Sequence, residues 1–157
     1  MDLYTLIKTL HIVSATILFG TGVGIANFML CGHRARLPVE RAFAARMTVR
    51  ADFIFTLPAV IVQPLSGGFL ILYGGFQWDD LWLTATYALY LIAGVCWIPV
   101  VILQMRMKHM LEAAVGDGNA FDERAYGRLF RVWFALGWPA FGGLILVFWL
   151  MVAKPTW

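Results

Sequence analysis

The sequence predicts an all-α membrane protein, a bundle of four transmembrane helices that forms one domain over residues 1–157. Hydrophobic residues make up 61% of the chain and charged residues only 13%, whereas a soluble domain carries roughly a quarter charged residues to cover its surface. The apolar residues are also gathered into four long runs. Each run supplies the about 20 residues needed to cross a hydrocarbon layer about 30 Å thick.

The four runs give the expected spans in order. The first covers residues 3–32 and is interrupted only by Lys8 and His11. The second, over residues 53–76, contains no charged residue, and the third and fourth cover residues 81–105 and 132–153. All four must be helical because backbone groups cannot be left unpaired in lipid. The regular polar and apolar alternation of a membrane β-barrel does not occur.

The connections between the runs predict the orientation. The first and third connections are rich in arginine, whereas the second is short and acidic, with Asp79 and Asp80. The positive-inside rule places the basic connections in the cytoplasm and both termini outside, with the chain in the inner (plasma) membrane. Tryptophans are then expected to anchor the outer interface. The basic residues are Arg34, Arg36, Arg41, Arg46 and Arg50, then Arg106, Lys108, Arg124, Arg128 and Arg131; the tryptophans are Trp78, Trp82 and Trp157.

Residues 37–50 in the first connection are expected to form a short amphipathic helix at the lipid headgroups. The net charge of +3 does not predict nucleic-acid binding, because the basic residues lie where topology requires them. Cys31 and Cys96 belong to different runs and form no Cys-x-x-Cys pair, so neither a disulfide framework nor a zinc site is expected.

Ionisable residues inside a span are costly and therefore mark candidate sites. Lys8 and His11 are three residues apart and share one helix face. His11 is expected about 12 Å from the outer helix end, at a depth similar to that of Tyr90 on the third helix. One interpretation makes His11 a haem-iron ligand or proton carrier. In the other, His11 hydrogen-bonds Tyr90 or a backbone carbonyl while Lys8 extends to the interface.

A bis-histidine haem site needs a second imidazole on a facing helix, and His33 and His109 lie at the wrong depth to supply it. Gly20, Gly22 and Gly24 form a small-residue patch. We expect this patch to pack against another helix.

Several short motifs resemble those of the HemJ-type protoporphyrinogen oxidases, which are small haem-containing membrane proteins with four spans. The likeness extends over nearly the whole chain in conserved order. The matching segments are Ile7-Lys8-Thr9-Leu10-His11-Ile12, Pro58-Ala59 with Gly67, Trp82-Leu83-Thr84-Ala85, Arg131 through Pro139, and Lys154-Pro155.

Departures from the family pattern limit what the resemblance implies. Thr86 stands where the family has a lysine, and Cys96 or Trp97 stands near its third-helix histidine. The chain therefore looks like a divergent relative without the oxidase activity, of the kind grouped as DUF2269 membrane proteins, and it is similar in architecture to CopD-like proteins. What carries over is Lys8 and His11, which implies a haem b pocket with His11 as iron ligand; the second axial position would be open or filled by a weaker donor such as Tyr90.

Three functions follow as alternatives. The first is a non-catalytic accessory or structural bundle, embedded in the lipid bilayer and associated with a larger membrane complex or with copies of itself. The second is a haem-binding redox protein with His11 as axial ligand. The third is a small transporter or channel formed by a homo-oligomer, which would need a continuous polar path.

Overall fold

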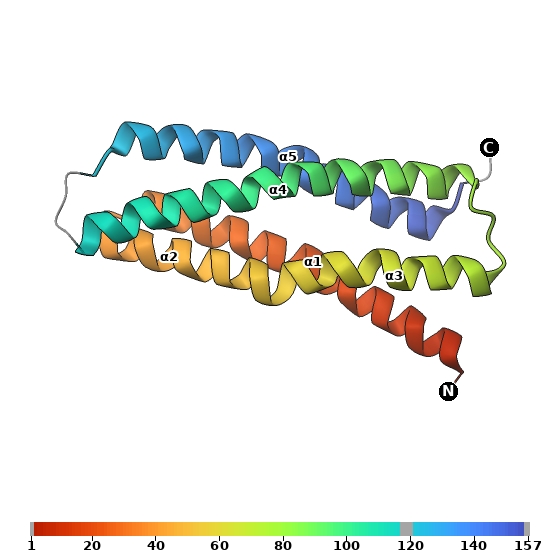
Figure 1. Cartoon of the computed structure of the whole chain (residues 1–157). Coiled ribbons are helices and arrows are strands. Elements are labelled where there is room, and N and C mark those ends of the chain that lie inside the picture. Colours follow the sequence, from red (N-terminus) through yellow and green to blue (C-terminus); the bar gives the residue numbers. More distant parts are fainter. Residues whose placement is uncertain (1, 117–120, 156–157) are drawn as a thin grey trace.

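The computed structural model describes residues 2–116 and 121–155, and the described residues are helical apart from short connections and ends (Figure 1). The elements are α1 (Leu3–Arg34), α2 (Pro38–Ala51), the π-helical segment η1 (Asp52–Thr56), α3 (Leu57–Gly74), α4 (Leu81–Gly116) and α5 (Glu123–Ala153). Because α2, η1 and α3 follow one another without a break, the chain forms four rods, each long and apolar enough to cross a membrane. The predicted all-α four-helix fold is confirmed. Trp157 lies outside the described residues.

The rods run side by side, with the start of α1 and the end of α5 at the same end of the bundle (Figure 1). They contain 31 to 37 residues, which corresponds to roughly 46–56 Å at 1.5 Å per residue. A hydrocarbon layer about 30 Å thick cannot enclose that length. Three of the rods therefore continue well past their expected spans at the arginine-rich end, beginning at Pro38 and Glu123 and ending at Gly116, whereas α1 ends at Arg34, close to the expected residue 32.

The helix expected at residues 37–50 is present as α2, but it does not lie apart from the bundle. It continues through η1 into α3, and Ala42, Ala45 and Thr48 are buried against the other rods. Its many alanines explain this position, since small side chains let helices approach closely. At Gly32 of α1 the approach is so close that an added Cβ would lie 2.6 Å from the Cβ of Ala44.

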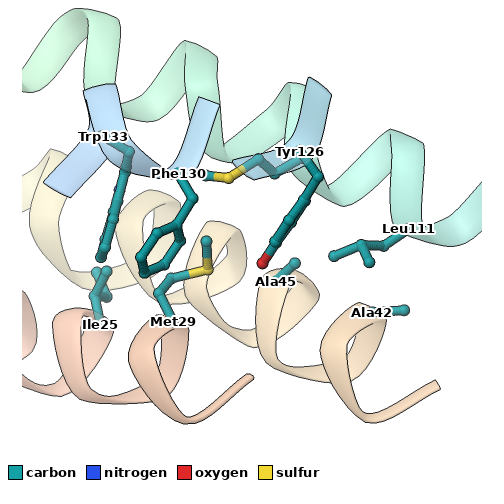
Figure 2. Close-up of a cluster of buried hydrophobic side chains, with 9 residues drawn as sticks. Ile25, Met29, Ala42, Ala45, Leu111, Tyr126, Phe130 and Trp133 are labelled. Atoms are coloured by element: carbon teal, nitrogen blue, oxygen red, sulfur yellow. The ribbon is translucent and has the colours of Figure 1, made fainter. Parts of the chain in front are cut away.

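A large apolar cluster closes the arginine-rich end, where all four rods meet (Figure 2). Met107 and Leu111 of α4 are completely buried there, and an ion pair of 2.7 Å joins Arg41 to Glu123 at its rim. The cluster consists of Ile25, Met29, Ala42, Ala45, Met107, Leu111, Tyr126, Phe130 and Trp133.

The opposite end is closed by a smaller cluster of Ile71, Trp82, Leu83 and Leu150, while the first half of α1 leans away from α4 and α5 (Figure 1). Between the two clusters the rods are less completely packed. That middle section contains the candidate site.

Candidate intramembrane binding cavity

A cavity of about 290 Å³ lies between α1, η1, α4 and α5. It is roughly twice as large as an engineered apolar cavity of about 150 Å³ that binds benzene, and it falls near the lower end of the range for small-molecule sites. Small residues create the space, because packed clusters at both ends hold the helices apart while these positions have little side chain to fill the gap. They are Gly22, Ala26, Ala93, Gly94, Gly137 and Ala140.

Asp52 supplies an acidic group to the cavity wall. Asp52 is only 3% exposed. One of its carboxyl oxygens, Oδ1, accepts a hydrogen bond of 3.3 Å from the indole Nε1 of Trp97. The other oxygen, Oδ2, has no hydrogen-bond partner in the described protein. An ionisable group inside a membrane bundle is by default a candidate for function.

The π-helical segment sets the position of Asp52. The backbone N–H of Leu57 donates to the carbonyl of Asp52, five residues earlier, instead of the usual four. Pro58 follows directly, and its ring lacks an N–H and would crowd the preceding turn of a regular α-helix. A single wide turn relieves this conflict, and such turns are frequent at functional sites.

Three further buried side chains in the cavity wall have polar atoms without a partner in the described protein. These atoms are the hydroxyl of Thr56, the indole Nε1 of Trp133 and both amide atoms of Gln104, a residue that is 1% exposed. Buried polar groups are almost always hydrogen-bonded, and each unpaired one costs about 1–3 kcal/mol. Thr56 and Gln104 lie beside the Asp52 carboxyl and can partly pair with it. The set therefore marks a polar end of an otherwise apolar cavity, where a bound molecule can complete the hydrogen bonding.

The cavity opens sideways, past α5. Phe134 and Trp138 both line it, yet they are 41% and 69% exposed. Trp138 is 15 residues from the end of α5 at Ala153, about 22 Å along the helix axis at 1.5 Å per residue. In a bilayer this opening faces acyl chains, not water.

His11 lies elsewhere, in the contact between α1 and α3. Its Nδ1 forms a hydrogen bond of 2.8 Å with the hydroxyl of Ser66, and its backbone carbonyl accepts a bond of 2.9 Å from the amide of Gln63. The hydroxyl of Ser14 donates to the carbonyl of Ala59 nearby, at 3.3 Å. These bonds join the two helices. The partner of the His11 imidazole is thus a serine hydroxyl and not the predicted Tyr90 or a backbone carbonyl.

Tyr90 does line the cavity, at the end away from Gln104. Its hydroxyl donates a hydrogen bond of 2.7 Å to the carbonyl of Val60, which is available because Pro64, four residues later, has no N–H to occupy it. Lys8 is exposed, with its ammonium 6.0 Å from the ring centre of Tyr4. His11, Lys8 and Tyr90 thus have three different sets of partners.

The described residues do not fit a haem in this cavity. No histidine or cysteine is among the residues that line it, and His11 lies instead in the contact between α1 and α3. The small-residue patch is also only partly as expected. An added Cβ on Gly22 would lie 3.0 Å from the ring of Phe141, whereas Gly20 and Gly24 face open space.

Sequence reasoning missed Asp52 because it placed this residue just before the second span, in a cytoplasmic connection. Gln104 fell inside the third span and was not singled out, and Trp97 was noted only for its position near the third-helix histidine of the HemJ-type family. One signal was present: a lone aspartate stands six residues before a proline at the start of a charge-free run, which is where a widened helical turn is useful.

Four apolar rods around a laterally open cavity define a polytopic integral membrane protein. The chain belongs to the DUF2269 family of predicted integral membrane proteins, whose sequence profile matches residues 5–155. Neither the curated proteins nor the solved structures give a match to this chain.

Proposed function

We propose that this protein is a membrane accessory protein that takes a small lipophilic molecule from the bilayer and holds it in the cavity. The unpartnered polar groups of Asp52, Thr56, Gln104 and Trp133 on an otherwise apolar wall carry this proposal. A bound molecule with a polar head would pair with some of these groups, Asp52 first, while its apolar part occupied the remaining volume.

The lateral opening supports a ligand that arrives through the lipid. Phe134 and Trp138 leave that side of the cavity accessible, so a molecule dissolved among the acyl chains can enter without crossing water. Transfer from lipid to an apolar cavity gains little hydrophobic energy, because acyl chains are as apolar as the wall. The head group therefore decides whether the molecule stays.

The cavity supports binding better than the two alternatives. Haem ligation by His11 would place the haem outside the cavity, because His11 lies in the contact between α1 and α3 and does not line the cavity. A pore would need a polar path through the membrane, whereas the unpartnered groups here gather toward the arginine-rich end. Association with a larger complex or with further copies of the chain is compatible with the proposal, since the outer faces of the rods are apolar.

We also propose that the arginine-rich end is cytoplasmic and that the protein lies in the inner (plasma) membrane, with both termini outside. The distribution of basic residues supports this orientation. Fusing alkaline phosphatase or a fluorescent protein to the C-terminus tests it, because phosphatase activity requires export and fluorescence of most such proteins requires the cytoplasm. An active phosphatase fusion is expected, and a fluorescent C-terminal fusion would reverse the orientation.

The binding function is tested by filling the cavity. Gly94 lines the cavity, and an added Cβ there meets nothing within 4 Å, so Gly94→Leu should occupy the space without a clash. Gly20→Leu is the matched control, since Gly20 also faces open space but does not line the cavity. After mild purification, mass spectrometry of an organic extract should find a lipophilic molecule that is roughly stoichiometric with wild type and Gly20→Leu and strongly depleted from Gly94→Leu. Equal recovery from all three proteins would overturn the proposal.

A further inference from the structure

We infer that the cavity selects a lipophilic amine, a molecule with one apolar tail and an ammonium head that pairs with Asp52; this inference rests on the proposed binding function. The juxtaposition that carries it is an unpaired carboxylate oxygen beside tryptophan side chains, in a cavity open to lipid.

The charges of the cavity wall favour a cation. Asp52 and Tyr90 are its ionisable residues, and no arginine, lysine or histidine contributes to the described lining. A buried charge is tolerated when an opposite charge and hydrogen bonds accompany it. An ammonium head would favour the ionised form of Asp52 and supply its countercharge, whereas a carboxylate or phosphate head would find no basic side chain in the described lining.

Hydrogen-bonding capacity at the same end suits an ammonium group. An ammonium nitrogen only donates, and the unpaired acceptors near this end of the cavity include Oδ2 of Asp52, the Gln104 amide oxygen and the Thr56 hydroxyl oxygen. The unpaired N–H groups of Gln104 and Trp133 receive no acceptor from such a head, so the pairing with Asp52 carries the selectivity. The indole N–H of Trp97 already holds Oδ1 at 3.3 Å. That bond fixes the carboxyl group and leaves Oδ2 to the ligand.

Aromatic rings strengthen the case for a cation. Trp97, Trp133 and Trp138 all line the cavity, and the Trp133 side chain extends from α5 toward Ile25 of α1 (Figure 2). Indole rings attract ammonium groups, most strongly where water is excluded. A neutral alcohol would gain the hydrogen bonds but neither the charge pairing nor this attraction.

The shape of the cavity favours a single tail. Its lining on α4 extends from Tyr90 to Gln104, which is about 21 Å along the helix at 1.5 Å per residue. With a volume of about 290 Å³ over that length, the cavity is long and narrow. One unbranched alkyl chain suits this form better than the paired chains of a diacyl lipid.

The test uses the full chain in phosphatidylcholine nanodiscs, with empty nanodiscs to subtract partitioning into lipid. Tritiated dodecylamine is the probe, and unlabelled dodecylamine, dodecanol and dodecanoate are the competitors. Wild type should bind the amine saturably, with displacement by the amine, at least tenfold weaker displacement by the alcohol, and none by the acid.

Variants assign the selectivity to Asp52. Asp52→Asn should weaken amine binding at least tenfold, and Asp52→Glu, which keeps the carboxylate, should retain the preference for amine over alcohol. Asp79→Asn is the control, because it removes the same charge from an exposed residue of the connection before α4. Wild-type binding of amine and alcohol with equal affinity, unchanged in Asp52→Asn, would overturn the inference and leave the binding function intact. No saturable binding of any probe, together with equal lipid recovery from Gly94→Leu, would overturn both.

Discussion

Replacing Gln104 by methionine should stabilise the ligand-free protein. Gln104 is 1% exposed, and both atoms of its amide lack a partner in the described protein. Removing an unpaired buried polar group recovers about 1–3 kcal/mol. Methionine has the same unbranched length, so the loss in packing should stay below about 1.5 kcal/mol. We therefore expect a net gain of about 1 kcal/mol in the free energy of unfolding.

A matched substitution should have the opposite effect. Gln63 is also a glutamine of a membrane helix and is partly buried, but its amide donates a hydrogen bond of 2.9 Å to the carbonyl of His11. Gln63→Met loses that bond, which is worth about 0.5–1.5 kcal/mol. The two variants thus carry the same chemical change and differ in whether the amide has a partner.

Thermal unfolding of delipidated protein in one detergent is the assay. A change of 1 kcal/mol shifts the Tm of a protein of this size by about 2–4 °C, so Gln104→Met should unfold a few degrees above wild type and Gln63→Met a few degrees below. Added dodecylamine should then raise the Tm of wild type more than that of Gln104→Met, because ligand binding stabilises the folded state in proportion to its affinity. A lower Tm for Gln104→Met than for wild type would refute the reasoning, since it would mean that the amide is already satisfied within the protein.

Three further predictions concern α1 and the residues that contact it. Gly32→Ala should lower the free energy of unfolding by about 1–3 kcal/mol, because the new Cβ would lie 2.6 Å from that of Ala44. Gly20→Ala, at a position that faces open space, should leave the free energy of unfolding unchanged or raise it by up to about 1 kcal/mol through helix propensity. Thermal unfolding compares the two variants, and the same Tm for both would contradict the close contact at Gly32. Ser66→Ala should cost about 1–3 kcal/mol by leaving the imidazole of His11 without its hydrogen bond, and an unchanged Tm would contradict the helix-joining role of that bond. The reduced-minus-oxidised spectrum of wild-type protein from haem-replete cells should contain no Soret band. A Soret band that is present in wild type and lost in His11→Ala would restore the haem interpretation.

The fold was predictable because lipid leaves few choices. A run of about 20 apolar residues in a membrane must become a helix, so four runs gave four rods. The helix ends were not predictable in the same way, since α2 and the second half of α4 pack in the apolar cluster at the arginine-rich end. Polar residues such as Arg46 and Lys108 interrupt the apolar runs there, while alanine and methionine continue the helical contacts beneath them.

The candidate site was harder to predict than the fold. His11 stood out because it interrupts an apolar run, yet its environment depends on Ser66, 55 residues away, which no local pattern links to it. Asp52 and Gln104 are likewise separated by about a third of the chain, and only the packing of η1 beside α4 puts both in the wall of one cavity. A cavity is a property of several helices together, so no single run of residues reveals it.

Photoaffinity labelling tests the central claim most directly, because it locates the ligand. A dodecylamine analogue with a diazirine in its tail would be activated on the protein in nanodiscs, with and without excess dodecylamine, and the labelled residues would be mapped by mass spectrometry. The account predicts that competition removes labels from cavity residues such as Gly94, Gly137 and Phe141. Labels confined to outward residues of α4 such as Leu91 and Val95, and insensitive to competition, would contradict it.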